Sequence, residues 1–194
     1  IQVPYMMEYL ICNNGAIVVT GSIDLTGTKL PELPRFGMRM ELHQPYENLV
    51  YYGRGPFENY IDRYSSSFIG RYEDKVENQF YWYTRPQETG NKTDVRWLSL
   101  LDSEGQGVRI TGLQPIAFSA LHFSPEDLDP GLTRKLQHTI DIVPQKNIFL
   151  HVDLKQRGLG GDNSWGMYPH NEYRLLDKKY TYSYMIELVK KNSD

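Results

Sequence analysis

The segment best suited to chemistry is a glycine-rich loop, residues 158–166, with the sequence GLGGDNSWG. Its glycines and small polar residues allow unusual backbone angles, and they lead to one large aromatic side chain, Trp165. A tryptophan in a plain core does not need so flexible an approach, and loops on a rigid scaffold often carry function. Such a side chain suits stacking against the C–H face of a sugar. Taken alone, however, the loop favours the alternative of a tryptophan packed at the edge of a sheet.

A second polar segment, residues 51–63 (YYGRGPFENYIDR), places two glycines around an arginine. Its arginines, Arg54 and Arg63, can pair with the carboxylates of Glu58 and Asp62. Because Arg–carboxylate pairs are strong and directional, we interpret the segment as a loop pinned by such pairs. It is not a phosphate-binding loop, since it lacks both the glycine spacing and the lysine of those loops.

A third polar segment, residues 85–97 (RPQETGNKTDVRW), leads into a predicted strand. Its charged side chains Glu88, Asp94 and Arg96 are able to contact a polar ligand. They are equally able to tie the loop to the sheet or to another domain through charge-assisted hydrogen bonds. We favour the structural role for this segment.

The remaining reactive residue types form no recognisable catalytic or metal site. No two histidines have the spacing of a helical metal site, although His151 and Asp153 alternate on one strand face. Retaining glycosidases need two carboxyl groups about 5 Å apart, and no spacing selects such a pair, Glu88 with Asp94 included. The single cysteine, Cys12, excludes an internal disulfide. We therefore expect no metal bound by this chain.

Composition indicates an ordinary globular protein. The 194 residues are 23% charged and 40% hydrophobic, with a formal net charge of -3 and a pI near 6.0. Neither value favours attraction to nucleic acid or to an anionic membrane, and no apolar run reaches the roughly 20 residues of a membrane helix. The aromatic content of 13%, with 15 tyrosines, fits strands, in which tyrosine is favoured.

The scaffold that positions these segments is predicted to be almost wholly β. Short apolar or alternating runs recur between turn residues, and helical periodicity is weak except for a capped turn at 124–128. The clearer runs are 16–25, 36–42, 49–52, 95–101, 108–112, 116–122, 136–143, 148–154 and 180–189. This pattern predicts a single domain over residues 1–194, a large antiparallel sandwich of two sheets with more than about ten strands.

Together, the polar segments resemble the C-terminal domain of family 2 β-galactosidases. The matching motifs are LPRFG at 33–37, YGRGPFENYIDR at 52–63, PQETGNKTDVR at 86–96, GLGGDNSW at 158–165 and YTYSY at 180–184. Each motif is weak alone, but their order and spacing make the resemblance specific. The resemblance covers nearly the whole chain.

The resemblance implies a β-sandwich of the galactose-mutarotase-like (supersandwich) type. It also implies that the two catalytic glutamates lie on a preceding (β/α)₈ barrel, which this sequence lacks because it has no alternating strand–helix pattern. No catalytic residue is therefore expected here. By the same resemblance, Trp165 is the aromatic platform that reaches the sugar in the barrel's active site. Asn163 is a weaker candidate for substrate binding, because the best-known family member has Asp at that position.

The resemblance implies that this chain is a fragment of a larger bacterial enzyme and is inactive alone. Its partners would be a β-galactoside and the rest of the polypeptide, above all the catalytic barrel, in a homo-oligomer without nucleic acid or membrane. Family members use Mg and Na ions bound elsewhere, and they occur in the cytoplasm or the periplasm. The alternatives are a free-standing carbohydrate-binding module, which predicts sugar affinity in the isolated chain, and an aldose mutarotase or epimerase, which pairs a His acid with a Glu base.

Overall fold

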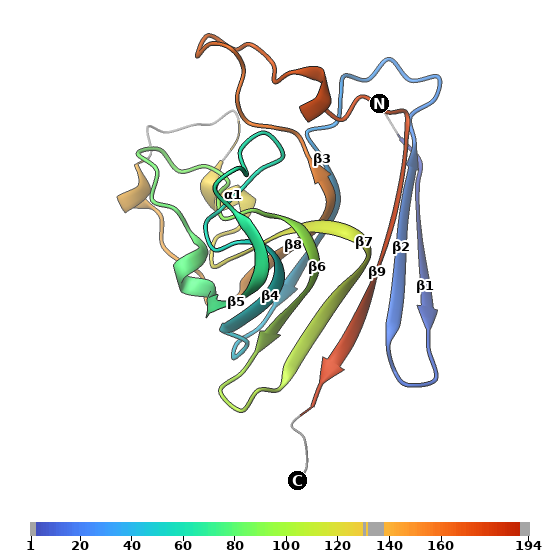
Figure 1. The fold of residues 1–194 in the computed structure, drawn as a ribbon, viewed down its shortest axis with the longest axis vertical. Coiled ribbons are helices and arrows are strands. Elements are labelled where there is room, and N and C mark those ends of the chain that lie inside the picture. The colour runs from blue at the N-terminus through green and yellow to red at the C-terminus, as the bar shows by residue number, and fades with distance from the viewer. Residues whose placement is uncertain (1–2, 130, 132–137, 191–194) are drawn as a thin grey trace.

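The computed structural model describes residues 3–129, 131 and 138–190, and these residues form an all-β fold (Figure 1). The strands are β1 (Tyr5–Ile11), β2 (Ile17–Asp24), β3 (Arg35–Leu42), β4 (Asn48–Gly55), β5 (Phe68–Lys75), β6 (Lys92–Leu101), β7 (Gly107–Leu121), β8 (Ile148–Gln156) and β9 (Lys179–Val189). The short helices are η1 (Val76–Gln79), α1 (Pro125–Leu128), η3 (Thr139–Asp141) and η4 (Asn171–Tyr173). The prediction of an all-β fold is confirmed.

The described strands form one antiparallel sheet in the order β1-β2-β9-β7-β6-β4-β5, with β3 and β8 attached as a branch. The branch starts on β7, whose first half pairs with β9 and whose last residues, 117–121, pair with β8. Strand β8 in turn pairs with β3. The predicted runs 108–112 and 116–122 are thus one strand of 15 residues, which is one reason why the described residues contain nine strands and not more than ten.

The β3–β8 branch faces strands β2 and β9 across the main core. The ring of Phe36 on β3 lies 5.7 Å from that of Tyr180 and 5.5 Å from that of Tyr182 on β9. The hydroxyl of Tyr184 lies 3.3 Å from Sδ of Met38. Alternate tyrosines of β9 therefore fill the core with an apolar body and a polar tip, which confirms part of the expected role of tyrosine. The finer assignment to the supersandwich type stays a prediction.

Two predicted features of local structure can be compared with the described residues, and two strands of the structure had no prediction. Ser124 and Asp127 form the expected cap of α1: the Asp127 N–H donates to Ser124 Oγ at 3.1 Å, and the Ser124 N–H donates to Asp127 Oδ2 at 2.8 Å. Strands β1 and β5 were not predicted, because nearly all their side chains are exposed and no apolar alternation marks them. The strand predicted at 136–143 is wrong over its described part.

That described part forms η3, because the side chain of Asp141 accepts a hydrogen bond from the His138 N–H at 2.7 Å and closes a turn. Residues 136 and 137 lie outside the described residues. No helix among the described residues is long and apolar enough to cross a membrane.

Candidate functional site

The glycine-rich loop connects β8 to η4 and carries Trp165 into solvent. The side chain of Trp165 is 88% exposed, so it is not packed at the edge of the sheet. Its backbone N–H donates to Oδ1 of Asn163 at 2.8 Å, and Gly166 follows with a φ of +93°, a conformation that favours glycine. Asn163 therefore shapes the turn that presents the indole.

Asp62, from the second polar segment, fixes the beginning of the loop. Its Oδ2 accepts a hydrogen bond from the Gly160 N–H at 2.8 Å. A Cβ at Gly158 would lie 2.7 Å from Cγ of Asp62, whereas one at Gly160 would meet the carboxylate only at 3.7 Å. Gly158 is thus required for the close approach of two chain segments that the sequence identified separately.

A buried carboxylate anchors the two ends of the loop. The side chain of Glu32 is 5% exposed, and its oxygens pair with Arg157 Nη1 at 3.0 Å and with Arg174 Nε at 2.6 Å. Burial acts to raise the pKa of Glu32, but hydrogen bonds from Arg174 and Arg157 outweigh it and lower the pKa below its ordinary value. Both guanidinium groups also lie over the ring of Tyr168, which joins the two ends to the loop itself.

Within the loop, an exposed ion pair adds a further contact. His170 Nε2 lies 2.7 Å from Oδ1 of Asp162. The hydrogen bond and charge of Asp162 raise the pKa of His170 above its ordinary value. The loop is therefore held by Asp62, by Glu32 and by this pair, while Trp165 remains free.

The second polar segment is pinned mainly through Glu58. Its Oε2 accepts hydrogen bonds from Thr89 Oγ1 at 2.7 Å and from the Gly90 N–H at 2.8 Å, and its Oε1 pairs with Arg63 at 2.5 Å and with the hydroxyl of Tyr83. Burial acts to raise the pKa of Glu58, but these hydrogen bonds lower it overall. The predicted Arg–carboxylate pinning is confirmed for Arg63 and Glu58.

The third polar segment serves the structural role that we favoured. Asp94 pairs with Arg54 Nε at 2.5 Å, and Arg54 also donates to the carbonyl of Ser67 at 3.0 Å. The buried amide of Asn59 bonds to the Thr93 N–H and hydroxyl at 2.9 and 2.5 Å. These contacts join residues 51–67 to β6, and they form the scaffold on which Asp62 stands.

Comparison with known sequences identifies the family of the chain. The profile of the family described as "Beta galactosidase small chain" matches residues 2–186. The chain belongs to this family. Among curated relatives, the small-chain domain is 34% identical to a β-galactosidase of Priestia megaterium over 182 residues, which are 93% of this chain and 17% of that protein.

Two further relatives are also β-galactosidases that are several times longer than this chain. The β-galactosidase of Streptococcus thermophilus is 33% identical over 96% of this chain and 17% of its own length. That of Halalkalibacterium halodurans is 32% identical over 90% of this chain and 17% of its own length. The small-chain domain thus spans about one sixth of the curated relatives it matches.

The small-chain domain also contains a buried polar cluster that the sequence indicated only by the alternation of His151 and Asp153. Arg35 on β3 reaches Asp153 with Nε at 2.9 Å, His151 with Nη1 at 2.9 Å and Gln156 with Nη2 at 3.1 Å, and it also pairs with Glu88. Burial raises the pKa of Asp153 to about 7, against the effect of Arg35. Burial and the charge of Arg35 lower the pKa of His151 to about 4.

This cluster joins β3 and β8 to the third polar segment and gives Glu88 a structural partner. Sequence alone could not find it, because Arg35 lies more than 50 residues from each of its ionic partners. Metal binding has no support in the part of the chain that the structure describes: it contains no group of three or more His, Cys, Asp or Glu side chains that could hold an ion.

Proposed function

We propose that this chain is the C-terminal domain of a bacterial β-galactosidase that hydrolyses terminal β-D-galactosides. In this proposal Trp165 forms one aromatic wall of the sugar pocket, and the catalytic glutamates lie on a (β/α)₈ barrel elsewhere in the polypeptide. The observation that carries the proposal is an exposed indole on a loop that is fixed at its base by Asp62 and Glu32. A loop that is held in place before the ligand arrives loses little conformational freedom on binding.

The side chains around the loop support a binding role and not a catalytic one. The carboxylates of Asp62, Asp162 and Glu32 are already engaged in holding the loop through Gly160, His170 and the two arginines. They are therefore not an acid and nucleophile placed about 5 Å apart on either side of a glycosidic bond. Since one wall is not a pocket, the isolated chain should hydrolyse no β-galactoside.

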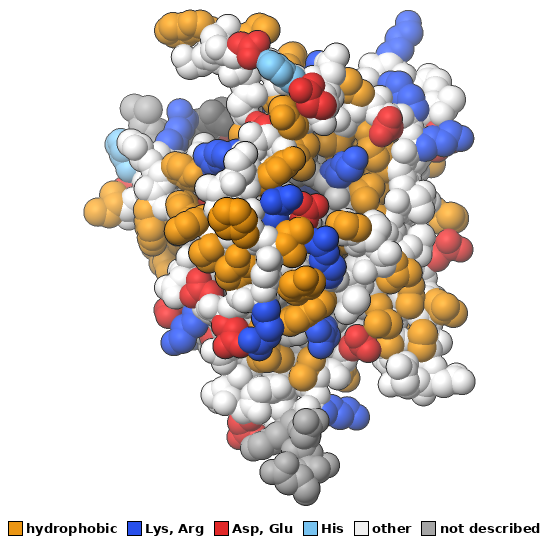
Figure 2. Space-filling model, in the orientation of Figure 1, with side chains coloured by type: hydrophobic (Ala, Val, Ile, Leu, Met, Phe, Trp, Pro, Cys, Tyr) orange, Lys and Arg blue, Asp and Glu red, His pale blue; other side chains and the backbone are white. Residues whose placement is uncertain are grey.

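An exposed apolar strand supports attachment to the rest of a larger protein. Figure 2 shows hydrophobic side chains gathered over β1 and β2 on the right-hand side of the molecule. The large exposed ones on β1 are Tyr5, Met6, Tyr9, Leu10 and Ile11. Tyr5, Tyr9 and Ile11 point to one face of β1 and Met6 and Leu10 to the other. Large apolar side chains exposed in this number mark an interaction surface. We assign it to the remaining domains of the polypeptide, because the matched relatives are about six times longer than this chain.

The experiment that tests the proposal is the substitution Trp165→Ala in the full-length enzyme, assayed on lactose and on an aryl β-galactoside. Loss of one aromatic contact, worth on the order of 1 kcal/mol beyond burial, should raise KM by roughly five- to tenfold and change kcat less. Trp165→Phe should recover part of the loss. Leu159→Ala, which removes another exposed side chain of the same loop, is the matched control and should leave both constants unchanged.

Two results would contradict the proposal. Unchanged kcat and KM in Trp165→Ala would show that the glycine-rich loop does not bind the sugar. An antibody raised against this chain should detect a band far heavier than 22.6 kDa in cells that produce the protein, and a band at that mass would exclude the multidomain enzyme.

A further inference from the structure

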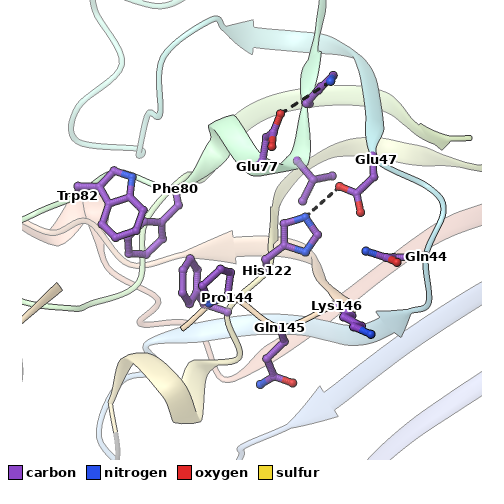
Figure 3. A pocket seen from close by; sticks show the side chains of 12 residues that line it. Gln44, Glu47, Glu77, Phe80, Trp82, His122, Pro144, Gln145 and Lys146 are labelled. Atoms are coloured by element: carbon purple, nitrogen blue, oxygen red, sulfur yellow. Dashed lines mark hydrogen bonds and ion pairs between the residues drawn. The ribbon is translucent and has the colours of Figure 1, made fainter. Parts of the chain in front are cut away.

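A second candidate binding site lies away from the glycine-rich loop. A cavity of about 490 Å³ opens beside η1, among the β3–β4 connection, the end of β7 and the chain that leads to β8 (Figure 3). Its lining includes Gln44, Glu47, Phe80, Trp82, His122 and Phe123. The volume is in the range of small-molecule sites. In Figure 1 η1 lies on the left at about mid-height, whereas residues 158–173 lie at the top, so the two sites are separate.

One side of the cavity is an aromatic platform. Trp82 is 65% exposed, yet its ring meets those of Phe80 and Phe123 edge-to-face, with centroids 5.0 and 6.3 Å away. Phe80 and Phe123 are themselves buried in a small hydrophobic cluster. The indole is therefore supported by the core while most of its surface remains open. This arrangement suits stacking against the apolar face of a pyranose ring.

The opposite side of the cavity offers a partly exposed carboxylate, because the side chain of Glu47 lines it and is 33% exposed. Nε2 of His122 lies 2.9 Å from Oε2 of Glu47, and Nδ1 lies 3.2 Å from the carbonyl of Asn147. The second oxygen of Glu47, Oε1, is buried and accepts no hydrogen bond from the described residues. Because Oε1 has almost no accessible surface, a ligand would reach the carboxylate through Oε2, which keeps a lone pair beyond the one that faces His122 and can accept a strong charge-assisted hydrogen bond from a hydroxyl.

The charges of the lining favour a neutral ligand. Two lysines, Lys75 and Lys146, are balanced by two glutamates, Glu47 and Glu77, and Lys75 and Glu77 lie 3.8 Å apart. A site for phosphate or carboxylate would carry an excess of positive charge. His122 and Glu47 bind each other, so they do not stand on opposite sides of a sugar as the acid and base of a mutarotase would.

We propose that this cavity is a saccharide-binding site distinct from the proposed catalytic pocket. A neutral pyranose stacks on Trp82 and donates a hydroxyl hydrogen to the carboxylate of Glu47. The inference does not rest on the role of Trp165, because it needs only residues of this cavity. It would let the enzyme hold an oligosaccharide or polysaccharide away from the site of hydrolysis.

The first test uses the 194-residue chain, once a cooperative melting curve has shown that it folds alone. It is a titration with methyl β-galactoside, methyl β-glucoside and lactose, followed by saturation-transfer NMR. We expect dissociation constants on the order of 1 mM, as for a small open site. Trp82→Ala should weaken binding by about tenfold or more, and Glu47→Gln by severalfold because a neutral acceptor replaces a carboxylate. Phe68→Ala, which removes another exposed aromatic side chain outside the cavity lining, is the matched control, and its binding should equal that of the unchanged chain.

The test does not depend on one substitution. Trp82 is largely exposed, so its removal leaves Phe80 and Phe123 in place, and a melting curve checks that the variant folds. Amide chemical-shift changes should also cluster at residues 44–47, 76–82 and 122–123 of the unchanged chain. Absence of binding at about 50 mM saccharide, or binding that Trp82→Ala leaves unchanged, would overturn the proposal. Binding lost in Trp165→Ala would place the saccharide at the glycine-rich loop instead.

A negative result for saccharide binding in this cavity can be distinguished from a negative result for the proposed role of Trp165. In the polypeptide that carries the catalytic barrel, Trp82→Ala should leave kcat/KM for a small aryl galactoside unchanged, whereas Trp165→Ala should lower it. A fall in kcat/KM on removal of Trp82 would mean that the cavity belongs to the catalytic site, which contradicts a separate site.

Discussion

The glycine-rich loop and the cavity beside η1 each expose one tryptophan, but they support it in different ways. Trp165 stands on a loop that is fixed by charged and polar contacts from Asp62 and Glu32. Trp82 stands on the buried rings of Phe80 and Phe123. A tryptophan supported by the core can share a cavity with its own polar wall. A tryptophan on a projecting loop needs another domain to supply the rest of its pocket.

The largest effect that separates the two regions should come from Phe123→Ala. Removal of a buried aromatic ring costs about 3–5 kcal/mol of the free energy of unfolding, because the cluster of Phe80, Leu121 and Leu128 cannot collapse fully around the gap. Urea denaturation measures the loss. A loss below about 1 kcal/mol would mean that Trp82 does not depend on the core for its support.

A smaller and more local effect should come from Gly158→Ala. The new methyl group would overlap the carboxylate of Asp62 and should cost about 1–3 kcal/mol through displacement of the loop. Gly160→Ala is the matched control, because its Cβ would meet the same carboxylate at ordinary contact distance. Faster proteolysis within residues 158–173 of Gly158→Ala, and not of Gly160→Ala, is the expected result. Equal rates would show that the contact with Asp62 does not fix the loop.

The smallest expected effect is a pH dependence that is confined to the glycine-rich loop. The pKa of His170 is raised by Asp162, so the contribution of this pair is fully present below the ordinary histidine pKa of about 6.5 and is lost as pH rises through the raised value. An NMR titration of the imidazole should show the raised pKa, and Asp162→Asn should bring it down. An identical pKa in both proteins would show that the pair does not form in solution.

The sequence was sufficient for features that depend on neighbouring residues. Alternating side chains marked most strands, and the Ser124–Asp127 cap predicted α1. Glycines and polar residues marked the loop of Trp165. Exposed strands such as β1 were not predicted, because a strand that buries neither face does not alternate between apolar and polar side chains.

Contacts between distant segments could not be predicted in the same way. Asp62 and Gly160 are 98 residues apart, and both segments were identified without any sign that they meet. The cavity beside η1 was missed altogether, because its residues come from four separate parts of the chain. No glycine-rich segment precedes Trp82, whereas such a segment marked Trp165 in the sequence.

The pairing of β2 with β9 has a consequence for how the domain is made. Thr20 and Ser183 meet across this pair although 163 residues separate them. The β1–β2 hairpin therefore leaves the ribosome long before the strand that completes its sheet. Pairing over such a sequence distance is slow, and meanwhile the hairpin exposes apolar side chains and an open edge. We expect it to be the segment that a chaperone binds during synthesis.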